Sequence, residues 1–294
     1  MDTEKANKPK QQYLHDAYKH LYQDFTPGYR HEPTDCAGFW FCFHDDLLLI
    51  TQNEEGKTTV PRGACPLGSS EYDGWPLYMG AYKGIDCFVL RLSKGNPRNS
   101  SRKFEKLRPL FDILPPEEFA LAGRASQILH WNLTHQFCGI CGEKTRDAKT
   151  ERAKECPQCG ELYYPRVTPA VIAAVTRGDL LLLARSRRWT KQIFSVVAGF
   201  VEPGETLEQA VEREVKEETA IEVKNIRYFG SQPWPFPTQL MVAFTAEYKQ
   251  GDIVVDENEL QEAKWVSREE IKTLHLPGSL SIARELIDWF LSSE

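Results

Sequence analysis

The chain has 294 residues, which is long enough for two compact domains. Its 41% hydrophobic and 27% charged residues are ordinary for a soluble globular protein. A formal net charge of −6 argues against a global basic field that would attract nucleic acid or an anionic membrane. No apolar run is long enough to span a bilayer, and the polar, lysine-rich N-terminus lacks the apolar core of a secretory signal. The expected location is the cytoplasm, with no membrane partner.

Short β-prone runs separated by Gly, Asn and Asp turns dominate the first hundred residues. These runs are 39–43, 47–51, 78–82 and 86–92. A short helix is expected around 13–22, and a polar loop is expected over 94–102. Pro115 then opens an amphipathic helix that continues to about Thr134. We predict a β-rich N-terminal domain over residues 1–134 that ends in this linking helix.

Four cysteines form two Cys-x2-Cys pairs, each in a turn that contains glycine or proline. They are Cys138, Cys141, Cys156 and Cys159. Two such turns present four thiolates tetrahedrally to Zn²⁺ and leave no ligand position for water, so we predict a structural zinc ribbon over residues 135–164. The alternative, two disulfides, suits a secreted protein, and nothing in the chain indicates secretion. The remaining cysteines lack ligand spacing and are expected to be buried small hydrophobic residues: Cys36, Cys42, Cys65 and Cys87.

Residues 165–294 change to a strand–turn–strand pattern and form the predicted third domain. Strands are expected over 170–176, 180–184, 194–198, 223–229 and 240–248, and a final amphipathic helix over 282–291. The turn Arg177-Gly178-Asp179 indicates a hairpin between the first two strands. This order suits a mixed α/β sandwich, and we expect the helix that carries Glu214 to lie between sheets.

The segment 199–221 carries the most informative chemistry of the chain. A glycine-bearing turn leads into a helix that contains Arg213, Glu214, Glu217 and Glu218. At 100° per residue, the three carboxylates share the arc of the apolar side chains Leu207, Ala210 and Val211, whereas a solvated acidic face would do the reverse. Like charges at these spacings repel and are costly to desolvate, so the cluster requires a cation. Hard carboxylate oxygens favour Mg²⁺ or Mn²⁺, and the alternative is an ordinary amphipathic helix with surplus acid.

This segment resembles the Nudix box, G-x5-E-x7-R-E-U-x-E-E-x-G-U, in which U is aliphatic. The matching residues are Gly199, Glu205, Arg213, Glu214, Val215, Glu217, Glu218 and Ile221. The chain departs from the pattern at the last glycine, where it has Ala220. This position lies just past the helix end, where a positive φ is common. Alanine costs about 1 kcal/mol if that geometry is kept, but the metal ligands are unaffected.

A second motif is Ser231-Gln-Pro-Trp-Pro-Phe-Pro237. Its three alternating prolines fix φ and prevent a helix, so we predict a stiff extended segment. Trp234 and Phe236 are near neighbours on it, and rigid aromatic rings are good platforms for a nucleobase or nicotinamide. The alternative is a proline-rich loop whose aromatic rings fill a core, and the chemistry alone does not decide between the two.

The second motif resembles the signature of the NADH pyrophosphatase branch of the Nudix hydrolases, also described as NAD-capped RNA hydrolases. The resemblance is strongest over residues 119–294. It implies an α+β fold with a β-rich N-terminal domain, a zinc ribbon and a Nudix α/β/α sandwich, and a homodimer with the site at its interface. The implied reaction is metal-dependent hydrolysis of the pyrophosphate bond of NAD(H) to AMP and nicotinamide mononucleotide. NAD-capped RNA is an alternative substrate, and the sequence does not choose between the two, nor between Mg²⁺ and Mn²⁺.

The resemblance also implies the site residues. The metal ligands would be the Ala198 carbonyl and the carboxylates of Glu214, Glu218 and Glu259, with Glu262 as the rival of Glu259. The catalytic set would be Glu218, Glu217 as candidate general base or further ligand, and Arg213, which orients a carboxylate. Phe200 and Trp234 would hold the nicotinamide between them. Further substrate contacts are implied for Glu151, Tyr164, Arg108, Ala283, Gln232, Pro233, Pro235, Phe236, Pro237, Thr238 and Gln239, the last of which replaces the usual serine.

Divalent ions held by these carboxylates are expected to bind the pyrophosphate oxygens, acidify a water and stabilise the leaving phosphate. The local basic run 185–188 is a further candidate for a phosphate contact. Two other functions stay open. A Nudix hydrolase of ADP-ribose or a dinucleoside polyphosphate would share every metal ligand. A non-catalytic zinc-ribbon adaptor for nucleic acid is disfavoured by the complete carboxylate set and the acidic net charge.

Overall fold

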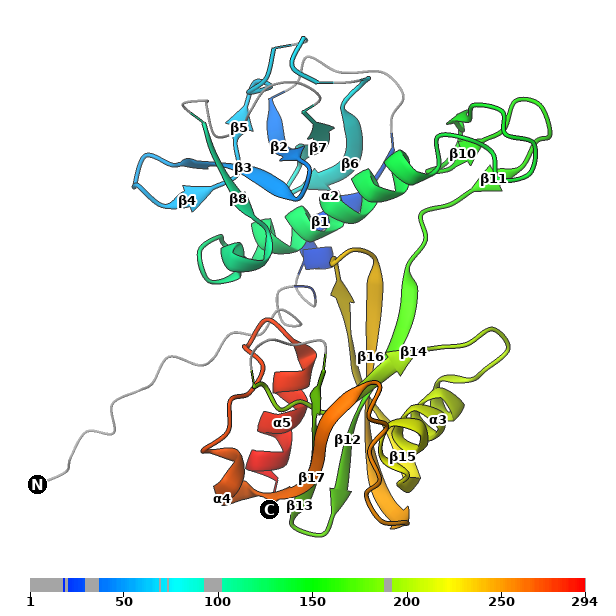
Figure 1. The fold of residues 1–294 in the computed structure, drawn as a ribbon. Helices are drawn as coiled ribbons and strands as arrows, with labels where there is room; N and C mark the ends of the chain where they lie inside the picture. Colours follow the sequence, from blue (N-terminus) through cyan, green and yellow to red (C-terminus); the bar gives the residue numbers. More distant parts are fainter. Residues whose placement is uncertain are drawn as a thin grey trace, which may run out of the picture. The chain divides into compact units, whose positions relative to one another are not determined.

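A computed structural model describes residues 18, 21–29, 37–68, 70–72, 74–92, 102–187 and 192–293 (Figure 1). The chain divides into two compact units. One comprises Pro169–Gln232 and Met241–Glu294, and the other comprises Ala17–Thr168 and Pro233–Leu240. Most of the expected helix at 13–22 and of the expected loop at 94–102 lies outside the described residues, although 18 and 21–24 are helical. The division into three domains stays a prediction.

The N-terminal part of the chain forms one eight-stranded sheet. Its strands are β1 (Phe25–Pro27), β2 (Gly38–His44), β3 (Leu47–Gln52), β4 (Thr58–Thr59), β5 (Arg62–Gly63), β6 (Leu77–Tyr82), β7 (Ile85–Arg91) and β8 (Lys103–Lys106). The main path is β1-β6-β7-β2-β3-β4, while β5 pairs with β2 and β8 pairs with β3. All four predicted runs are strands. The strands that were not predicted are only two to four residues long, which is too short to show a periodicity.

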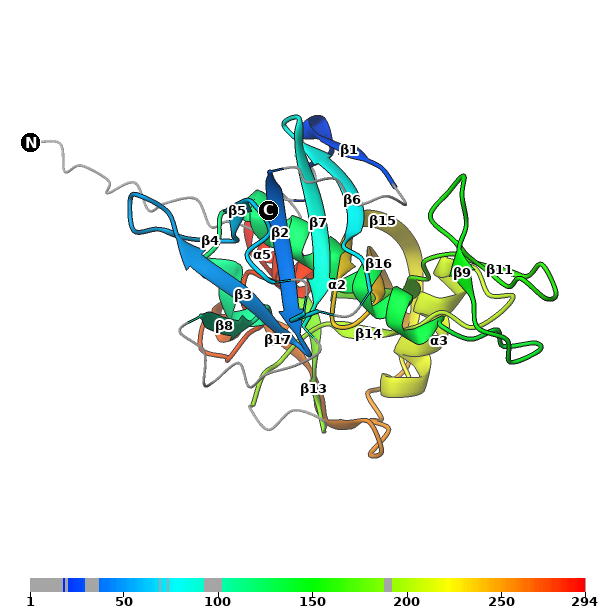
Figure 2. The same cartoon turned by 90° about the horizontal axis from the view of Figure 1, so that it is seen from above.

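The predicted linking helix is α2 (Pro116–Thr134), which follows the short 3-10 helix η2 (Arg108–Asp112). Figure 2 shows α2 crossing behind β2 and β7, and its buried side chains, such as Phe119 and Leu121, explain this packing. Glu118 in its first turn is also buried. Its carboxylate accepts hydrogen bonds from the Thr59 hydroxyl and the Val60 amide, both at 2.8 Å, and pairs with Arg62. The start of α2 is therefore attached to the segment between β4 and β5.

The zinc-ribbon region has a three-stranded antiparallel sheet. Its strands are β9 (Arg146–Asp147), β10 (Lys154–Glu155) and β11 (Leu162–Tyr163), in the order β11-β10-β9. This sheet is small, and its local core consists of Cys138, Cys156 and Tyr163. So little apolar burial does not stabilise a domain of this size alone, which is the usual setting for a structural metal.

The C-terminal part of the chain forms a six-stranded sheet. Its strands are β12 (Thr168–Arg177), β13 (Leu180–Ser186), β14 (Val197–Phe200), β15 (Glu222–Trp234), β16 (Gln239–Gln250) and β17 (Leu260–Ser267). The order is β15-β16-β12-β13-β17, and β14 pairs with β12. The predicted hairpin turn is present between β12 and β13, where Gly178 has a φ of 57°. The edge strand β17 and the short helix α4 (Arg268–Ile271) were not predicted.

Two helices cover the two faces of this sheet, as the predicted α/β/α sandwich requires (Figure 1). Helix α5 (Ile282–Ser292) packs Leu286 and Phe290 into a core with β12, β13 and β16. Helix α3 (Leu207–Thr219) contacts β14 and buries Val211 and Val215. The expectation that the glutamate-bearing helix lies between sheets is wrong, because the six strands form one sheet and α3 lies against one side of it.

Helix α3 has well-defined ends. At its start the Thr206 side chain accepts from the Gln209 amide at 3.2 Å, and the Gln209 side chain accepts from the Thr206 amide at 2.9 Å, which completes a capping box. At its end Ala220 adopts the left-handed conformation, with φ 58° and ψ 12°, and its amide donates to the Lys216 carbonyl at 2.8 Å. The Nudix-box geometry is therefore kept although alanine replaces the glycine.

Ala220→Gly is expected to raise the free energy of unfolding by about 1 kcal/mol, because glycine has no Cβ to penalise the left-handed backbone. Urea denaturation of both proteins measures the difference. Ala210→Gly in the interior of the same helix is the matched control, and it should lower the stability by about 1 kcal/mol or more. A destabilised Ala220→Gly protein would contradict the strain assigned to this residue.

Candidate active site and zinc ribbon

The four predicted zinc ligands converge in space. Their Sγ atoms all lie within 4.8 Å of one another, with 3.4 Å between Cys141 and Cys156 and 3.6 Å between Cys138 and Cys159. A tetrahedral ion about 2.3 Å from each sulfur requires sulfurs about 3.8 Å apart, so the set fits Zn²⁺. The two turns are alike, since Gly142 and Gly160, at φ 77° and 76°, each donate to the first cysteine of their pair at 3.0 Å.

Tyr163 supports this cluster and was not predicted. Its hydroxyl accepts from the Gly139 amide at 2.9 Å and lies 3.2 Å from the Cys138 sulfur. The Tyr163 hydroxyl, together with the backbone amides of Cys141 and Ile140, lowers the pKa of Cys138 to about 6, which favours the thiolate that zinc requires.

The other cysteines follow the prediction in part. None of the described cysteines forms a disulfide. Cys42 and Cys87 are buried as expected, Cys65 is only partly buried, and Cys36 lies outside the described residues.

The predicted catalytic helix packs closely on the strand before it. A Cβ at Gly199 would lie 1.9 Å from the Glu214 Cδ atom, so only glycine allows the carboxylate to approach the backbone of β14. Ala198, whose carbonyl is a predicted ligand, directly precedes Gly199 in this strand. The glycine of the box thus brings Glu214 against the backbone beside Ala198.

Arg213 contacts the strand, the turn and the helix of the Nudix box. Its guanidinium forms a two-point pair with Glu205, at 2.8 and 2.9 Å, and donates to the Phe200 carbonyl at 2.8 Å. The same group donates to Glu214 at 2.8 Å and to Glu217 at 3.0 Å. The pair holds the pKa of Glu205 below its usual range and raises that of Arg213. Arg213 thus contacts the carboxylates of Glu205, Glu214 and Glu217, and its role in orienting a catalytic carboxylate stays a prediction.

Burial separates the three helical glutamates. Glu218 is buried and the Glu214 side chain is 14% exposed, whereas the Glu217 side chain is 60% exposed. The prediction that Glu217 shares the apolar face is therefore wrong. The buried residues Val215 and Thr219 move the centre of that face away from Glu217, which comes to lie at its edge.

Burial raises the pKa of Glu214, the nearby Arg213 lowers it, and the charges of Glu217 and Glu259 raise it further. The carboxylate of Glu259 is thus close enough for its charge to act on Glu214. Glu259 precedes β17, and its carbonyl accepts from the Arg187 amide at 2.9 Å. Its rival Glu262 lies within β17 and pairs with Arg185 and Lys264, both at 3.4 Å. Glu262 is therefore engaged with two cations, and the choice between Glu259 and Glu262 as downstream ligand stays a prediction.

The carboxylates of the acidic group do not converge as tightly as the four cysteine sulfurs do. Within the described parts of the chain, the four cysteines are the only set of three or more ligand atoms that lie within 4.8 Å of one another. An acidic set in which Glu214 is desolvated and faces other carboxylates nevertheless has the donor chemistry that a hard divalent cation requires.

The proline–aromatic segment forms the tip of the β15–β16 hairpin. It is extended as predicted up to Trp234, but residues 235–238 form a turn, in which the Phe236 amide donates to the Trp234 carbonyl at 2.9 Å. The Trp234 and Phe236 rings are perpendicular, with centroids 5.1 Å apart. The Arg108 guanidinium lies 5.2 Å from the first ring and 4.6 Å from the second. The sequence placed Arg108 near the substrate but did not predict that it covers these rings.

The remaining predicted contacts have different surroundings. The Tyr164 hydroxyl donates to Glu151 at 3.1 Å, so these two residues are brought together. Phe200 is 51% exposed, as a stacking platform requires. The Gln232 amide is buried and engaged, since it donates to the Leu280 carbonyl and accepts from the Ile282 amide, both at 3.0 Å. Ala283, in the first turn of α5, is buried in the core.

Three further residues of the hairpin tip were predicted as substrate contacts. Pro235 is buried against α2, where a Cβ on Gly123 would approach its Cγ to 3.0 Å. The Thr238 carbonyl accepts from the Thr168 amide at 2.8 Å. The Gln239 Oε1 atom is buried with no hydrogen-bond partner among the described residues.

Comparison with protein families matches three profiles along the chain. They are a NADH pyrophosphatase-like rudimentary NUDIX domain over residues 37–131, a NADH pyrophosphatase zinc ribbon domain over 133–164 and a NUDIX domain over 166–290. Proteins described as "NAD-capped RNA hydrolase NudC" from Shigella boydii serotype 18 and Shigella flexneri are 40% and 41% identical over 255 residues. These alignments cover 85% of this chain and 92% of each relative. The chain belongs to the NADH pyrophosphatase branch of the Nudix hydrolases.

The Nudix membership and the zinc-ribbon prediction are thereby confirmed. Among solved structures, a Nudix hydrolase from Nitrosomonas europaea is 23% identical, with a TM-score of 0.46 over 53% of this chain and 90% of that one. In the portions of this Nudix hydrolase that the structure describes, no helix has both the length and the apolar character needed to cross a membrane.

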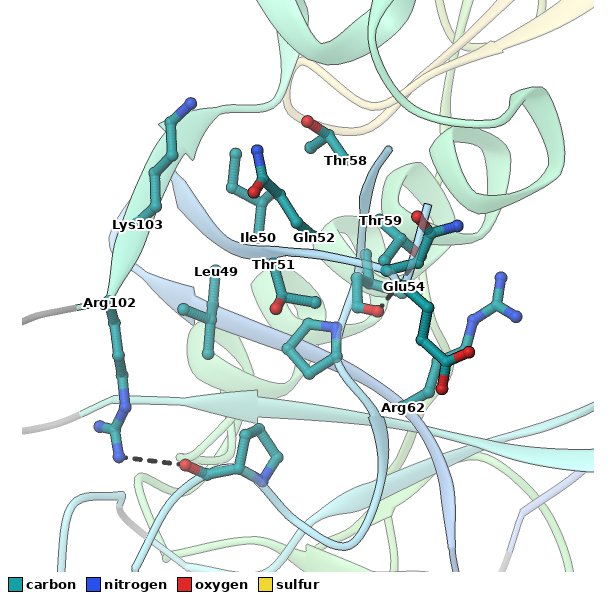
Figure 3. A pocket seen from close by; sticks show the side chains of 14 residues that line it. Leu49, Ile50, Thr51, Gln52, Glu54, Thr58, Thr59, Arg62, Arg102 and Lys103 are labelled. Carbon is teal, nitrogen blue, oxygen red and sulfur yellow. Dashed lines mark hydrogen bonds between the residues drawn. The ribbon is translucent and has the colours of Figure 1, made fainter. Parts of the chain in front are cut away.

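The N-terminal domain of this Nudix hydrolase contains a cavity of about 930 Å³ (Figure 3). Its lining includes Thr51, Arg62 and Arg102, and none of the predicted site residues. Figure 3 shows Arg102 directed toward the Pro66 carbonyl, and the two arginines already pair with Glu71 and Glu118. A second hollow of about 620 Å³ lies beside the box and is lined by Glu205, Arg213 and Glu217 among others. The second hollow, and not the larger cavity, adjoins residues of the Nudix-box pattern.

Proposed function

We propose that this protein hydrolyses the pyrophosphate bond of NAD(H) to AMP and nicotinamide mononucleotide, and that it acts on the same bond at the 5′ end of NAD-capped RNA. The observation that carries the proposal is the joint presence of the desolvated carboxylates Glu214 and Glu218 on α3 and of the Trp234–Phe236 pair, which follows α3 in the sequence. The relatives named NAD-capped RNA hydrolase carry the same activity in their names and match 85% of the chain.

The metal site we propose consists of the Ala198 carbonyl and the carboxylates of Glu214, Glu218 and Glu259. Mg²⁺ or Mn²⁺ bound there would supply a Lewis acid for the diphosphate oxygens and a more acidic water. Arg213 keeps Glu214 in place through its contacts with Glu205 and the Phe200 carbonyl. Glu217 is exposed beside this group and is the residue that can accept a proton from water at the solvent side.

On the substrate side, the aromatic rings of Phe200 and Trp234 are the proposed platforms for the nicotinamide. Glu151 and Tyr164, which hydrogen-bond to each other, provide polar contacts, and Arg108 adds a cation beside the Trp234 ring. We further propose that the protein is a cytoplasmic homodimer. Size-exclusion chromatography with light scattering measures the mass of the particle, and a monomer at micromolar concentration would contradict the dimer.

The experiment that tests the proposed function compares the kcat/KM of the purified protein for NADH and for ADP-ribose, with Mg²⁺ or Mn²⁺ present. ADP-ribose has the same pyrophosphate but lacks the nicotinamide, so the aromatic platform is expected to favour NADH by about tenfold or more. Chromatography of the products should show AMP and the reduced nicotinamide mononucleotide. Faster cleavage of ADP-ribose would identify ADP-ribose, and not NADH, as the preferred substrate. No cleavage of either compound would favour a non-catalytic protein.

A further inference from the structure

The loop between the two cysteine pairs is attached to the N-terminal sheet at two points. We call residues 148–153 the ribbon loop. The Arg152 guanidinium donates to the Gly28 carbonyl and, at 2.6 Å, to the Tyr78 carbonyl. The Tyr29 hydroxyl donates to the Thr150 carbonyl. Gly28 and Tyr29 follow β1 and Tyr78 belongs to β6, so both attachments reach the same edge of the sheet, within one compact unit.

Arg152 is held by main-chain carbonyls instead of a carboxylate. No acidic side chain lies within 4.0 Å of its guanidinium in the described residues, whereas its neighbours Arg146 and Lys154 both form ion pairs. Burial and the nearby charge of Arg124 together lower the pKa of Arg152 to about 10, although the charge of Asp147 opposes them, so the group is still charged at neutral pH. A partly desolvated charge that is in direct contact with no carboxylate is costly. Its rigid fork of donors, however, fixes the direction of the chain that carries it.

The two attachment points flank Glu151. Thr150 is held on one side and Arg152 on the other. Within the ribbon loop the Ala148 amide donates to the Ala153 carbonyl at 2.9 Å, and the Ala153 amide donates to the Glu151 carbonyl at 3.0 Å. The Glu151 carboxylate accepts from the Tyr164 hydroxyl at 3.1 Å. The backbone of Glu151 is thus fixed from outside the ribbon, and its side chain is fixed from within it.

We propose that Arg152 is a positioning residue, which holds Glu151 in its substrate-binding orientation by anchoring the ribbon loop to the N-terminal sheet. The β-rich domain thereby contributes to substrate binding although it carries no catalytic constellation of its own. This inference rests on the proposed function, in which Glu151 contacts NAD(H). Because the metal carboxylates belong to other elements, Arg152 acts on the KM for the substrate and leaves kcat nearly unchanged.

Steady-state kinetics with NADH test this role in Arg152→Met, which keeps the aliphatic length but removes the donors. The KM is expected to rise about 10-fold, with kcat within about twofold of the original value. Arg152→Lys should restore part of the affinity, since it keeps the charge and one donor. The matched control is Arg146→Met, which removes the same charge from an exposed site of the ribbon and should leave KM unchanged. Zinc content and the unfolding temperature are measured for each protein.

Should Arg152→Met fail to fold, Tyr29→Phe decides the question. It removes a single hydroxyl from an exposed side chain and is expected to raise KM about threefold. Unchanged KM in Arg152→Met or, if that protein is unfolded, in Tyr29→Phe would overturn the proposal. A fall in kcat with no change in KM would do the same.

A double-mutant cycle separates positioning from a merely structural effect. If Arg152 acts through Glu151, Arg152→Met should add nothing to the KM of Glu151→Ala. If Arg152→Met raises KM by the same factor in the original protein and in Glu151→Ala, the proposal is overturned. An unchanged KM in Glu151→Ala would show that Glu151 does not bind the substrate, and this would overturn the inference about Arg152. The proposed function would still stand in that case, provided that the original enzyme hydrolyses NADH.

Discussion

Glu218→Gln is expected to lower kcat for NADH hydrolysis by about 1000-fold, with no change in zinc content and little change in stability. Glu218 is the most deeply buried carboxylate of α3, at 8% exposed, and faces the same side as Val211 and Val215. Glutamine has the same shape but no charge, so it fills the site and loses affinity for a divalent cation. Measurement of kcat at saturating Mn²⁺, together with far-ultraviolet circular dichroism, checks both parts of the expectation.

Two control variants on the same helix sharpen this result. Glu212→Gln changes an exposed carboxylate of α3 that is not among the predicted metal ligands, and it should leave kcat unaffected. Glu217→Gln removes the exposed carboxylate that contacts Arg213, and a smaller loss of about 10- to 100-fold is expected if it serves as the base. Activity retained in Glu218→Gln would exclude Glu218 from the metal site, and equal losses in all three variants would point to a general effect on the helix.

Local patterns allowed the fold and the zinc site to be predicted from the sequence. The two Cys-x2-Cys pairs of this chain form the same local turn, with Gly142 and Gly160 in matching positions, and this is why the four sulfurs converge as expected. The same holds for the left-handed conformation of Ala220, which depends on the end of one helix. Strand β17 has less local signal. Its residues Gln261, Glu262 and Lys264 are polar, and the strand exists because β13 pairs with it along its length.

The wrong placement of Glu217 on the apolar face also arises because contacts with neighbouring elements are not visible in a local pattern. Leu207, Ala210 and Val211 defined the predicted apolar arc, and these three residues all lie in the first half of the helix. The position of the buried face is decided by what covers the second half, where Val215 and Thr219 are buried and Glu217 is not. A helical wheel contains no information about the neighbouring strand, so it cannot separate Glu217 from Glu218.

Contacts between residues that are far apart in the sequence could not be predicted from sequence patterns. Tyr163 supports Cys138 from 25 positions away, and Arg152 reaches the Gly28 carbonyl over 124 positions. Neither residue has a distinctive spacing. The family resemblance points to the adjacent Tyr164, as a substrate contact, and not to Tyr163. The sequence therefore indicated the four zinc ligands but not the residues that support them.

Removal of the zinc ion is expected to disorder the ribbon and to weaken substrate binding through Glu151 and Tyr164. The local core is too small to hold the ribbon together without metal, and a structural zinc ion contributes about 10 kcal/mol or more in isolated zinc-binding peptides. Cys156→Ser, at a fully buried ligand, should therefore lose about one zinc ion per chain and become sensitive to proteolysis between the cysteine pairs. The KM for NADH should rise about 10-fold or more, because the Tyr164–Glu151 hydrogen bond depends on both ends of the ribbon.

Cys65→Ser, at a partly buried cysteine outside the cluster, is the matched control and should keep its zinc. Elemental analysis and limited proteolysis measure the two effects, and a Cys156→Ser protein with full zinc content and an unchanged digestion pattern would contradict the assigned ligand set.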